Sequence, residues 1–139
     1  MSSAQIAKEI AVIMPKVARG IVFRFFQMVD IPQTQLFVIM ILHEQKTCRV
    51  SELSSLMKVS VPTVTGLIDR MARAGYAKRI PDREDRRVIH IVLTPKGVSV
   101  AKKLRKTIQD RWQGVVEKLP AEDAENYLRI LKRIQGLLT

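Results

Sequence analysis

The side chains that most often do chemistry in proteins are few in this sequence of 139 residues. His43 and His90 are the only histidines, Cys48 is the only cysteine, and their spacing does not fit a zinc site. The chain has no Gly-rich phosphate loop and no Gly-x-Ser-x-Gly turn that would present a serine nucleophile. We therefore expect a protein that is not an enzyme and that uses neither a metal nor a cofactor.

Positive charge is the chemistry that the sequence carries in quantity. Lys and Arg total 24 against 13 Asp and Glu, which leaves a net charge of +11. A charge of this size repels itself unless an anion is near, so it favours a polyanionic partner such as nucleic acid. The excess is spread over the whole chain, and composition alone therefore does not locate a binding surface.

Arginines gather in one short turn, at residues 82–87 with the sequence DREDRR. The runs on either side, 77–80 and 88–93, are rich in β-branched residues and predict an antiparallel hairpin. Arg83, Arg86 and Arg87 would then lie on a thin projecting ribbon, which suits the narrow and strongly negative minor groove of DNA. Solvated turns that bind nothing also contain arginines. The hairpin alone is therefore weak evidence for DNA binding, and a second DNA-binding feature has to lie beside it in the sequence.

Two short helices separated by a three-residue turn supply that feature. The first is expected to begin near Ser51 and the second at Ser60, and a helix-turn-helix of this kind lays its second helix in the major groove. Apolar residues recur along one side of the second helix, and its outer face carries small residues first and cations later. The candidate DNA-binding residues of this recognition helix are Ser60, Pro62, Thr63, Thr65, Gly66, Arg70 and Arg73.

The remaining elements have to position the helix-turn-helix and the hairpin. Apolar residues step by three and four up to about Met28, which predicts a long amphipathic helix with a kink at Pro15. Residues 36–42 are apolar on every side and predict a helix that is buried all round. Thr94 and Pro120 each precede a further amphipathic helix.

The terminal helices are expected to form a dimer. Their apolar stripes would otherwise have to form the core of a monomer, and the middle block is too small to cover all of them. We expect residues 1–31 and 95–139 to be dimerisation helices and residues 32–94 to be the DNA-binding part of a single chain. The candidate dimerisation residues are Ile6, Ile10, Ile13, Trp112, Val115, Leu131, Ile134 and Leu138.

A set of residues along the chain matches a known pattern, and its most specific part runs from Asp82 to Gly97. The other matching positions are Gln35, Leu36, 51–53, Ser60, 63–65, 67–71, Gly75, Tyr76 and Arg79. With these residues the sequence resembles the multiple antibiotic resistance regulator (MarR) family of winged-helix transcription factors. The resemblance implies a mainly α fold with a small β-hairpin, in which a winged helix-turn-helix domain is flanked by N- and C-terminal dimerisation helices.

The resemblance also implies a function. It implies a transcriptional regulator, expected to be a ligand-responsive repressor, that binds a palindromic operator in double-stranded DNA as a homodimer. It implies a pocket between the dimerisation and DNA-binding parts for a small aromatic or lipophilic effector of unknown identity.

Individual roles follow from the same resemblance. Thr63, Thr65 and Arg70 match recognition-helix contacts, and Arg86 matches a wing arginine that enters the minor groove. Two further positions, Asp69 and Arg87, resemble a pair that ties the wing to the recognition helix. Gly66 departs from the pattern, because many members have arginine there, and this leaves the base preference open.

Three alternatives stay open from the sequence. A non-specific architectural DNA-binding protein would need the same charge. A membrane-surface protein could use Lys102, Lys103, Arg105 and Lys106 beside the apolar stripe of their helix. A redox-sensing regulator could use Cys48 beside Lys46 and Arg49, unless burial silences the thiol.

The expected compartment is the cytoplasm. The first residues do not resemble a signal peptide. The longest apolar run, 36–42, is far below the roughly 18 residues of a membrane span, so no membrane partner is expected.

Overall fold

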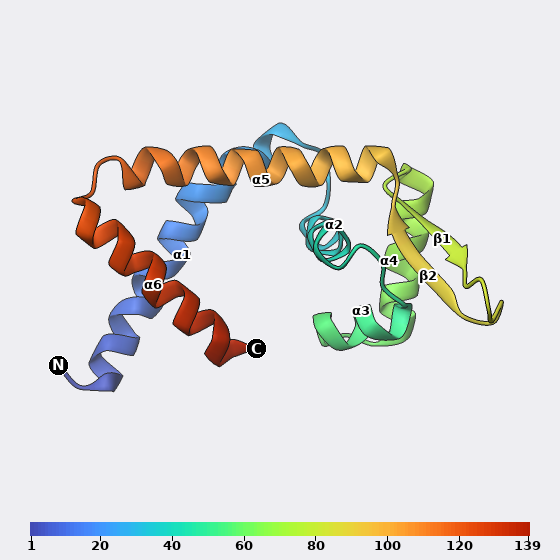
Figure 1. Cartoon of the computed structure of the whole chain (residues 1–139), viewed down its shortest axis with the longest axis horizontal. Helices are drawn as coiled ribbons and strands as arrows, with labels where there is room; N and C mark the ends of the chain where they lie inside the picture. Colours follow the sequence, from blue (N-terminus) through green and yellow to red (C-terminus); the bar gives the residue numbers. More distant parts are fainter. The chain divides into compact units, whose positions relative to one another are not determined.

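The computed structural model describes residues 1–139 as six helices and one antiparallel hairpin (Figure 1). The prediction of a mainly α fold with a small hairpin is confirmed. In chain order the elements are α1 (Ser3–Met28), α2 (Gln33–Gln45), α3 (Val50–Met57), α4 (Val61–Ala74), β1 (Ala77–Pro81), β2 (Ile89–Leu93), α5 (Pro95–Val116) and α6 (Ala121–Leu138). The chain divides into two compact units, residues 25–105 and residues 1–24 with 106–139.

Helix α2 supplies much of the core of the unit formed by residues 25–105. Leu36, Val38, Ile39 and Leu42 are each at most 2% exposed. The expectation that this helix is buried all round is wrong, since Phe37 is 55% exposed. An all-apolar helix has no sequence signal that tells its covered side from its open side, and only the packing of the neighbouring elements decides it.

The helix-turn-helix is formed by α3 and α4, with the three residues 58–60 between them as expected. Ser60 precedes α4 as its N-cap, and its Oγ accepts a hydrogen bond from the backbone N–H of Thr63. Gly75 ends α4 with a φ of 84°, a left-handed conformation that glycine adopts at little cost. The buried face of α4 consists of Val64, Leu67, Ile68 and Met71, as the helical spacing predicts.

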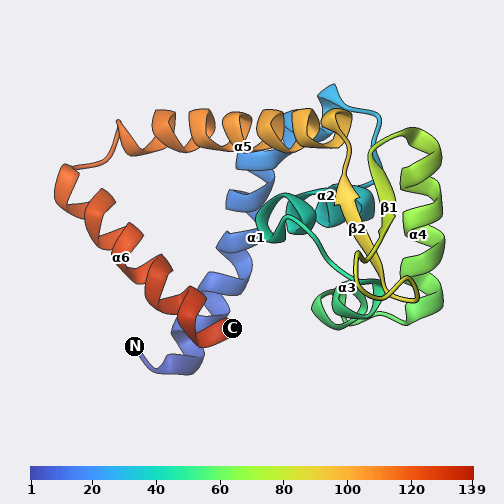
Figure 2. The same cartoon turned by 45° about the vertical axis from the view of Figure 1, so that its right-hand side comes forward.

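The hairpin pairs Ala77 with Leu93 at one end and Pro81 with Ile89 at the end next to the turn. Cys48, in the link between α2 and α3, adds an antiparallel bridge to Ile91. At the exit of β2, Thr94 caps α5 by accepting from the N–H of Gly97. Gly97 fits against the backbone of Tyr76 so closely that a Cβ atom there would lie 2.2 Å from the Tyr76 carbonyl oxygen. Figure 2 shows the hairpin beside α4.

The other unit contains the first 24 residues and the segment from 106 to the end. Helix α1 continues without a break through Pro15. Arg111 donates to the backbone oxygen of Gly20, with an Nη2 to O distance of 2.8 Å. The ring of Trp112 contacts the ring of Tyr127 with centroids 5.6 Å apart.

By length and hydropathy, no single helix here could cross a membrane; α1 and α2 meet the criterion only when they are taken together as a bent pair.

Candidate nucleic-acid interface

The outer face of α4 is open to solvent. Ser60, Pro62, Thr63, Thr65, Arg70 and Arg73 are all exposed, and Gly66 is half-buried. The two hydroxyls at the start of the helix are already ordered, since Ser60 Oγ lies 2.7 Å from Thr63 Oγ1. Small polar groups therefore lie at the N-terminal end of α4, and the two arginines follow about two to three turns later.

Arg70 extends back along α4 toward these hydroxyls. Its Nη1 atom lies 4.0 Å from the place that a Cβ atom on Gly66 would occupy. Long side chains on a helix point toward its N-terminus, so this direction is the ordinary one. A guanidinium nitrogen of Arg70 thus lies beside Gly66, the position where the family pattern often has an arginine.

The loop of the hairpin is organised by Asp82. Its Oδ2 accepts from the backbone N–H groups of Glu84 and Asp85 at 3.0 and 3.1 Å, and its Oδ1 lies 2.7 Å from Nε2 of His90. The hydrogen bond from His90, followed by the two backbone donors, lowers the pKa of Asp82 to about 2. An ionised carboxylate therefore fixes the loop from within.

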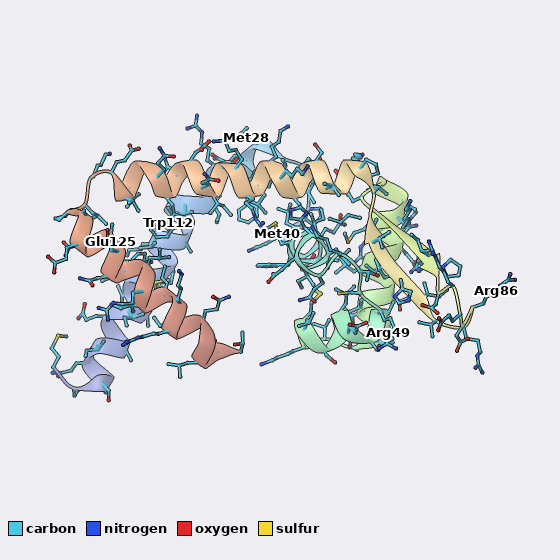
Figure 3. All side chains as sticks on the ribbon, in the orientation of Figure 1. Met28, Met40, Arg49, Arg86, Trp112 and Glu125 are labelled. Carbon is cyan, nitrogen blue, oxygen red and sulfur yellow. The ribbon has the colours of Figure 1, made fainter.

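The arginines of this loop differ in whether they have a partner. Arg83 and Arg86 are exposed and form no ion pair or hydrogen bond, whereas Arg87 bonds to Asp85 with an Nε to Oδ1 distance of 3.1 Å. Figure 3 shows Arg86 extending outward from the end of the hairpin. The loop thus carries two guanidinium groups that are available to an anion.

The expected pair between Asp69 and Arg87 is wrong in this structure. Asp69 Oδ1 instead accepts from Nη2 of Arg79 at 2.7 Å, and Arg87 is held by Asp85 two residues before it. Arg79 lies on β1, the strand that packs on α4, while the side chain of Arg87 is 92% exposed at the far end of the loop. The hairpin is therefore tied to α4 through the strand and not through the loop.

Sequence reasoning missed the roles of Arg79 and His90. Arg79 matched the family pattern, but no role was assigned to it. The sequence favours a structural or surface role for His90 over metal binding but gives it no partner. The hairpin register supplies a signal, because it pairs position 90 with Ile80, two residues before Asp82. His90 is therefore in a diagonal cross-strand position to Asp82, and side chains in such positions can contact each other.

Cys48 lies in the core of the same unit and is 1% exposed. Burial, together with the charge of Glu52, raises the pKa of the thiol. A thiolate is the reactive form of cysteine, so both effects oppose the redox-sensing alternative.

The candidate dimerisation residues all lie in the unit of residues 1–24 and 106–139. Ile6, Ile10 and Ile13 are 45 to 51% exposed on α1. On α5 and α6 the exposed residues of the set are Val115, Ile134 and Leu138, while Trp112 and Leu131 are half-buried. Their role in dimerisation stays a prediction.

Comparison with known proteins agrees with this geometry. The sequence model of the MarR family matches residues 31–89, which hold the helix-turn-helix and most of the hairpin. The HTH-type transcriptional regulator YfiV of Bacillus subtilis is 37% identical over 65 residues, covering 47% of this chain and 41% of that protein. This chain therefore spans less than half the length of that curated relative.

Solved structures extend the likeness to nearly the whole chain. A MarR family protein from Bacillus stearothermophilus has a TM-score of 0.85 and 25% identity, covering 99% of this chain and 98% of that chain. The transcriptional regulator Tm0710 from Thermotoga maritima has a TM-score of 0.68 and 30% identity, covering 97% and 92%. With the helix-turn-helix and the arginine-bearing hairpin in place, this chain belongs to the MarR family of DNA-binding transcriptional regulators.

Proposed function

We propose that this chain is a ligand-responsive repressor that binds a palindromic operator as a homodimer. The observation that carries the proposal is the joint placement of two cationic groups in the unit of residues 25–105. One is the outer face of α4 with Arg70 and Arg73, and the other is the hairpin loop with Arg83 and Arg86. The ion pair between Arg79 and Asp69 holds the hairpin against α4, so both can meet one duplex together.

The two groups suit different parts of DNA. A helix with small residues at its start can approach base edges in the major groove, and its arginines can reach bases or phosphates. A free guanidinium at the end of a thin hairpin suits the minor groove, since it loses less hydration than an ammonium would. We therefore assign base reading to Thr63, Thr65 and Arg70, and minor-groove contact to Arg86.

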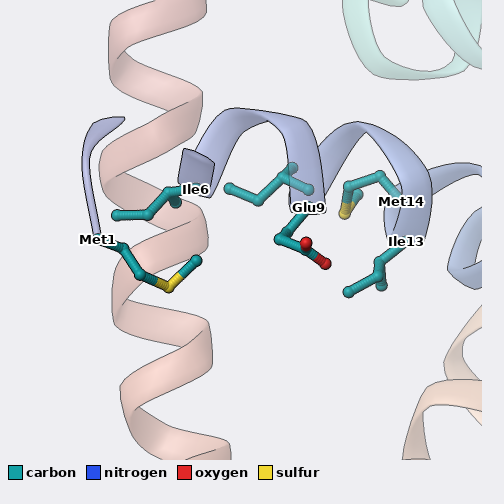
Figure 4. Close-up of a pocket in the computed structure, with 6 residues that line it drawn as sticks. Met1, Ile6, Glu9, Ile13 and Met14 are labelled. Carbon is teal, nitrogen blue, oxygen red and sulfur yellow. The ribbon is translucent and has the colours of Figure 1, made fainter. Parts of the chain in front are cut away.

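A homodimer is supported by apolar surface at both ends of the chain. At the start of α1 a hollow is lined by Met1, Ile6, Ile10, Ile13 and Met14, with Glu9 as its one charged member (Figure 4). Further large apolar side chains are exposed on α6. Two copies that bury the same surface against each other are related by a two-fold axis. A dimer with this axis binds two half-sites whose centres are separated by one turn of the DNA helix or by a whole number of turns.

The test begins with selection of bound fragments from genomic DNA, followed by affinity measurements on a selected site. We expect binding to the selected palindrome to exceed binding to a scrambled duplex by at least about a thousandfold at physiological salt. Equal affinity for both duplexes would overturn the proposal and support an architectural protein.

A further inference from the structure

His90 is the side chain through which β2 reaches the arginine-bearing loop of residues 82–87. Its Nε2 atom lies 2.7 Å from Oδ1 of Asp82, the first residue of that loop. The side chain of His90 is 29% exposed and that of Asp82 is 33% exposed, so water reaches the contact only in part. A hydrogen bond in such a place is stronger when its donor is charged.

Charged groups lie beside His90 on the elements around it. The hairpin register places Lys78 of β1 diagonally from it, and the link between α2 and α3, which bridges to β2, places Arg49 opposite it. Arg49 is paired with Glu52 of α3, with an Nε to Oε1 distance of 3.0 Å. The pKa of Glu52 is lowered first by its hydrogen bonds from Arg49 and least by the charge of His90. Asp82 is thus the one carboxylate that bonds to His90.

Helix α2 carries the other histidine, His43, at a distance from the loop. His43 and Lys46 lie beside Leu93, which pairs with the first residue of β1, whereas the loop follows the last residue of that strand. The pKa of His43 is lowered, first by burial and then by the charges of Lys46, Arg105 and Lys102. The ring of His43 is therefore mostly uncharged above pH 6.5.

Two further groups near the hairpin keep their charge state around neutral pH. The pKa of Asp82 is about 2, so this carboxylate stays ionised. Burial and the charge of Glu52 raise the pKa of the Cys48 thiol above its ordinary value of 9.0, so it stays protonated. Histidine ordinarily changes its charge between about pH 5 and 8. A change of charge at this contact near neutral pH therefore falls to the imidazole of His90.

Asp82 transmits the contact to the loop. Its Oδ2 accepts from the backbone N–H groups of Glu84 and Asp85, and its own N–H donates to the oxygen of Val88 at 2.8 Å. These bonds close the loop around one carboxylate. Arg86, which extends outward from the loop in Figure 3, therefore takes its position from the place where Asp82 is held.

We propose that protonation of His90 tightens the arginine-bearing loop, so that the chain binds its DNA site more strongly at pH 6 than at pH 8. The charged imidazole holds the Asp82 carboxylate more firmly than the neutral ring, and this gain is lost as the pH rises. His90 is a positioning residue, because it acts on Arg86 only through Asp82. The effect on DNA rests on the proposed function, whereas the tightening of the loop is measured without DNA.

Hydrogen exchange of the free full chain, followed by nuclear magnetic resonance, tests the loop. The amides of Glu84 and Asp85 donate to Asp82, so their protection against exchange reports on this contact. Protection is taken relative to an unstructured peptide at the same pH, which removes the intrinsic effect of pH on exchange. We expect the protection to fall about two- to fivefold between pH 6 and pH 8.

Variants assign this pH dependence to one ring. His90→Gln keeps a hydrogen-bond donor but cannot become charged, so protection should be low and equal at both pH values. His90→Arg carries a permanent charge and should protect the amides at both pH values as the parent chain does at pH 6. The matched control, His43→Gln, removes the other histidine of the same unit and should keep the pH dependence of the parent chain.

Three results would overturn the proposal. These are equal protection at pH 6 and pH 8 in the parent chain, a pH dependence that persists in both His90 variants, and a pH dependence that disappears in His43→Gln. The two His90 variants have opposite expected levels of protection, so the test stands on the other should one of them not fold.

Fluorescence anisotropy with the selected operator, at constant salt, tests the effect on DNA. The affinity of the parent chain and of His43→Gln should fall about two- to fivefold from pH 6 to pH 8, and that of His90→Gln should fall less. An equal fall in all three would overturn the link between His90 and DNA and leave the proposed function standing. Absence of specific binding would defeat the proposed function and leave the exchange measurements standing.

Discussion

His90 Nε2 lies 2.7 Å from Asp82 Oδ1, and this contact joins β2 to the first residue of the arginine-bearing loop. The other carboxylate oxygen of Asp82 accepts from the backbone of Glu84 and Asp85. A single side chain therefore links the strand to the loop and sets the loop's path. The position of Arg86 depends on this carboxylate, although Asp82 itself need not touch DNA.

Replacing Asp82 with Asn should loosen the loop. The amide can accept fewer of the three hydrogen bonds and carries no charge, so the backbone amides of Glu84 and Asp85 should exchange their hydrogens faster. Affinity for the operator should fall while the helical content stays unchanged. Glu84→Gln removes the same charge from the same loop and is the control; equal exchange rates in the two variants would contradict this role of Asp82.

The same carboxylate gives a pH dependence. The pKa of Asp82 is about 2 in the folded chain against an ordinary value of 3.8, so the folded state binds its proton less readily than the unfolded state. The stabilisation is therefore complete above pH 4 and is lost as the pH falls from about 4 to 2. Unfolding followed by circular dichroism over this range should show a smaller loss of stability in Asp82→Asn than in the parent chain, and equal losses would count against the shift.

Arg86→Ala should weaken operator binding and lower the salt slope by about one unit, because one cation no longer displaces a counterion from the duplex. Arg129→Ala, which removes a cation from α6, should change neither quantity by a comparable amount. Fluorescence anisotropy at several salt concentrations measures both, and an unchanged affinity and slope would remove Arg86 from the interface.

The tie between the hairpin and α4 can be measured by a double-mutant cycle. Asp69→Asn and Arg79→Gln should show a coupling of about 0.2 to 1 kcal/mol in urea unfolding, because both side chains are partly open to water. The corresponding cycle with Asp69→Asn and Arg87→Gln should show none. Coupling in the second cycle and not in the first would restore the pairing that the family pattern implies.

The limits of the sequence as a guide follow from these residues. Periodicity and capping predicted α4 from Ser60 to Gly75, because its N-cap, buried stripe and C-terminal glycine are all local signals. The partner of Asp69 was not local. It depends on how β1 packs on α4, because that packing brings Arg79 close to Asp69. The spacing of residues along the sequence does not give the distance between these two side chains.

A pocket of about 270 Å³ beside His43 in the unit of residues 25–105 shows the same limit. Its residues come from α2, β2 and α5, which lie far apart in the sequence. Lys102 appeared in the sequence only as one of four cations on a helix face, and nothing in the spacing connected it with Lys46. Local patterns predicted the elements and the arginine loop, whereas contacts between elements required the structure.

Gly97→Ala should destabilise the junction between the hairpin and α5. The added Cβ would lie 2.2 Å from the Tyr76 oxygen and 3.0 Å from Leu93 Cδ2, so backbone has to move, at a cost of about 1 to 3 kcal/mol. Gly136→Ala is the control, since nothing lies within 4 Å of its Cβ and alanine favours a helix by about 0.5 to 1 kcal/mol. The midpoint of thermal unfolding should fall in Gly97→Ala and rise in Gly136→Ala. A shift in the same direction in both variants would contradict the close approach of Gly97 to Tyr76.

Ile10→Asp should shift the chain toward the monomer. Ile10 is 51% exposed at the hollow on α1, and a carboxylate there could not be buried against a second copy without a large desolvation cost. Leu56→Asp, which changes a residue 55% exposed on α3 in the other unit, should leave the association unchanged. Sedimentation equilibrium measures the mass of each. Because a monomer presents one recognition helix and a dimer two, the Ile10 variant should also lose most of its preference for the palindrome over a single half-site. An Ile10 variant that sediments as a dimer would place the interface elsewhere.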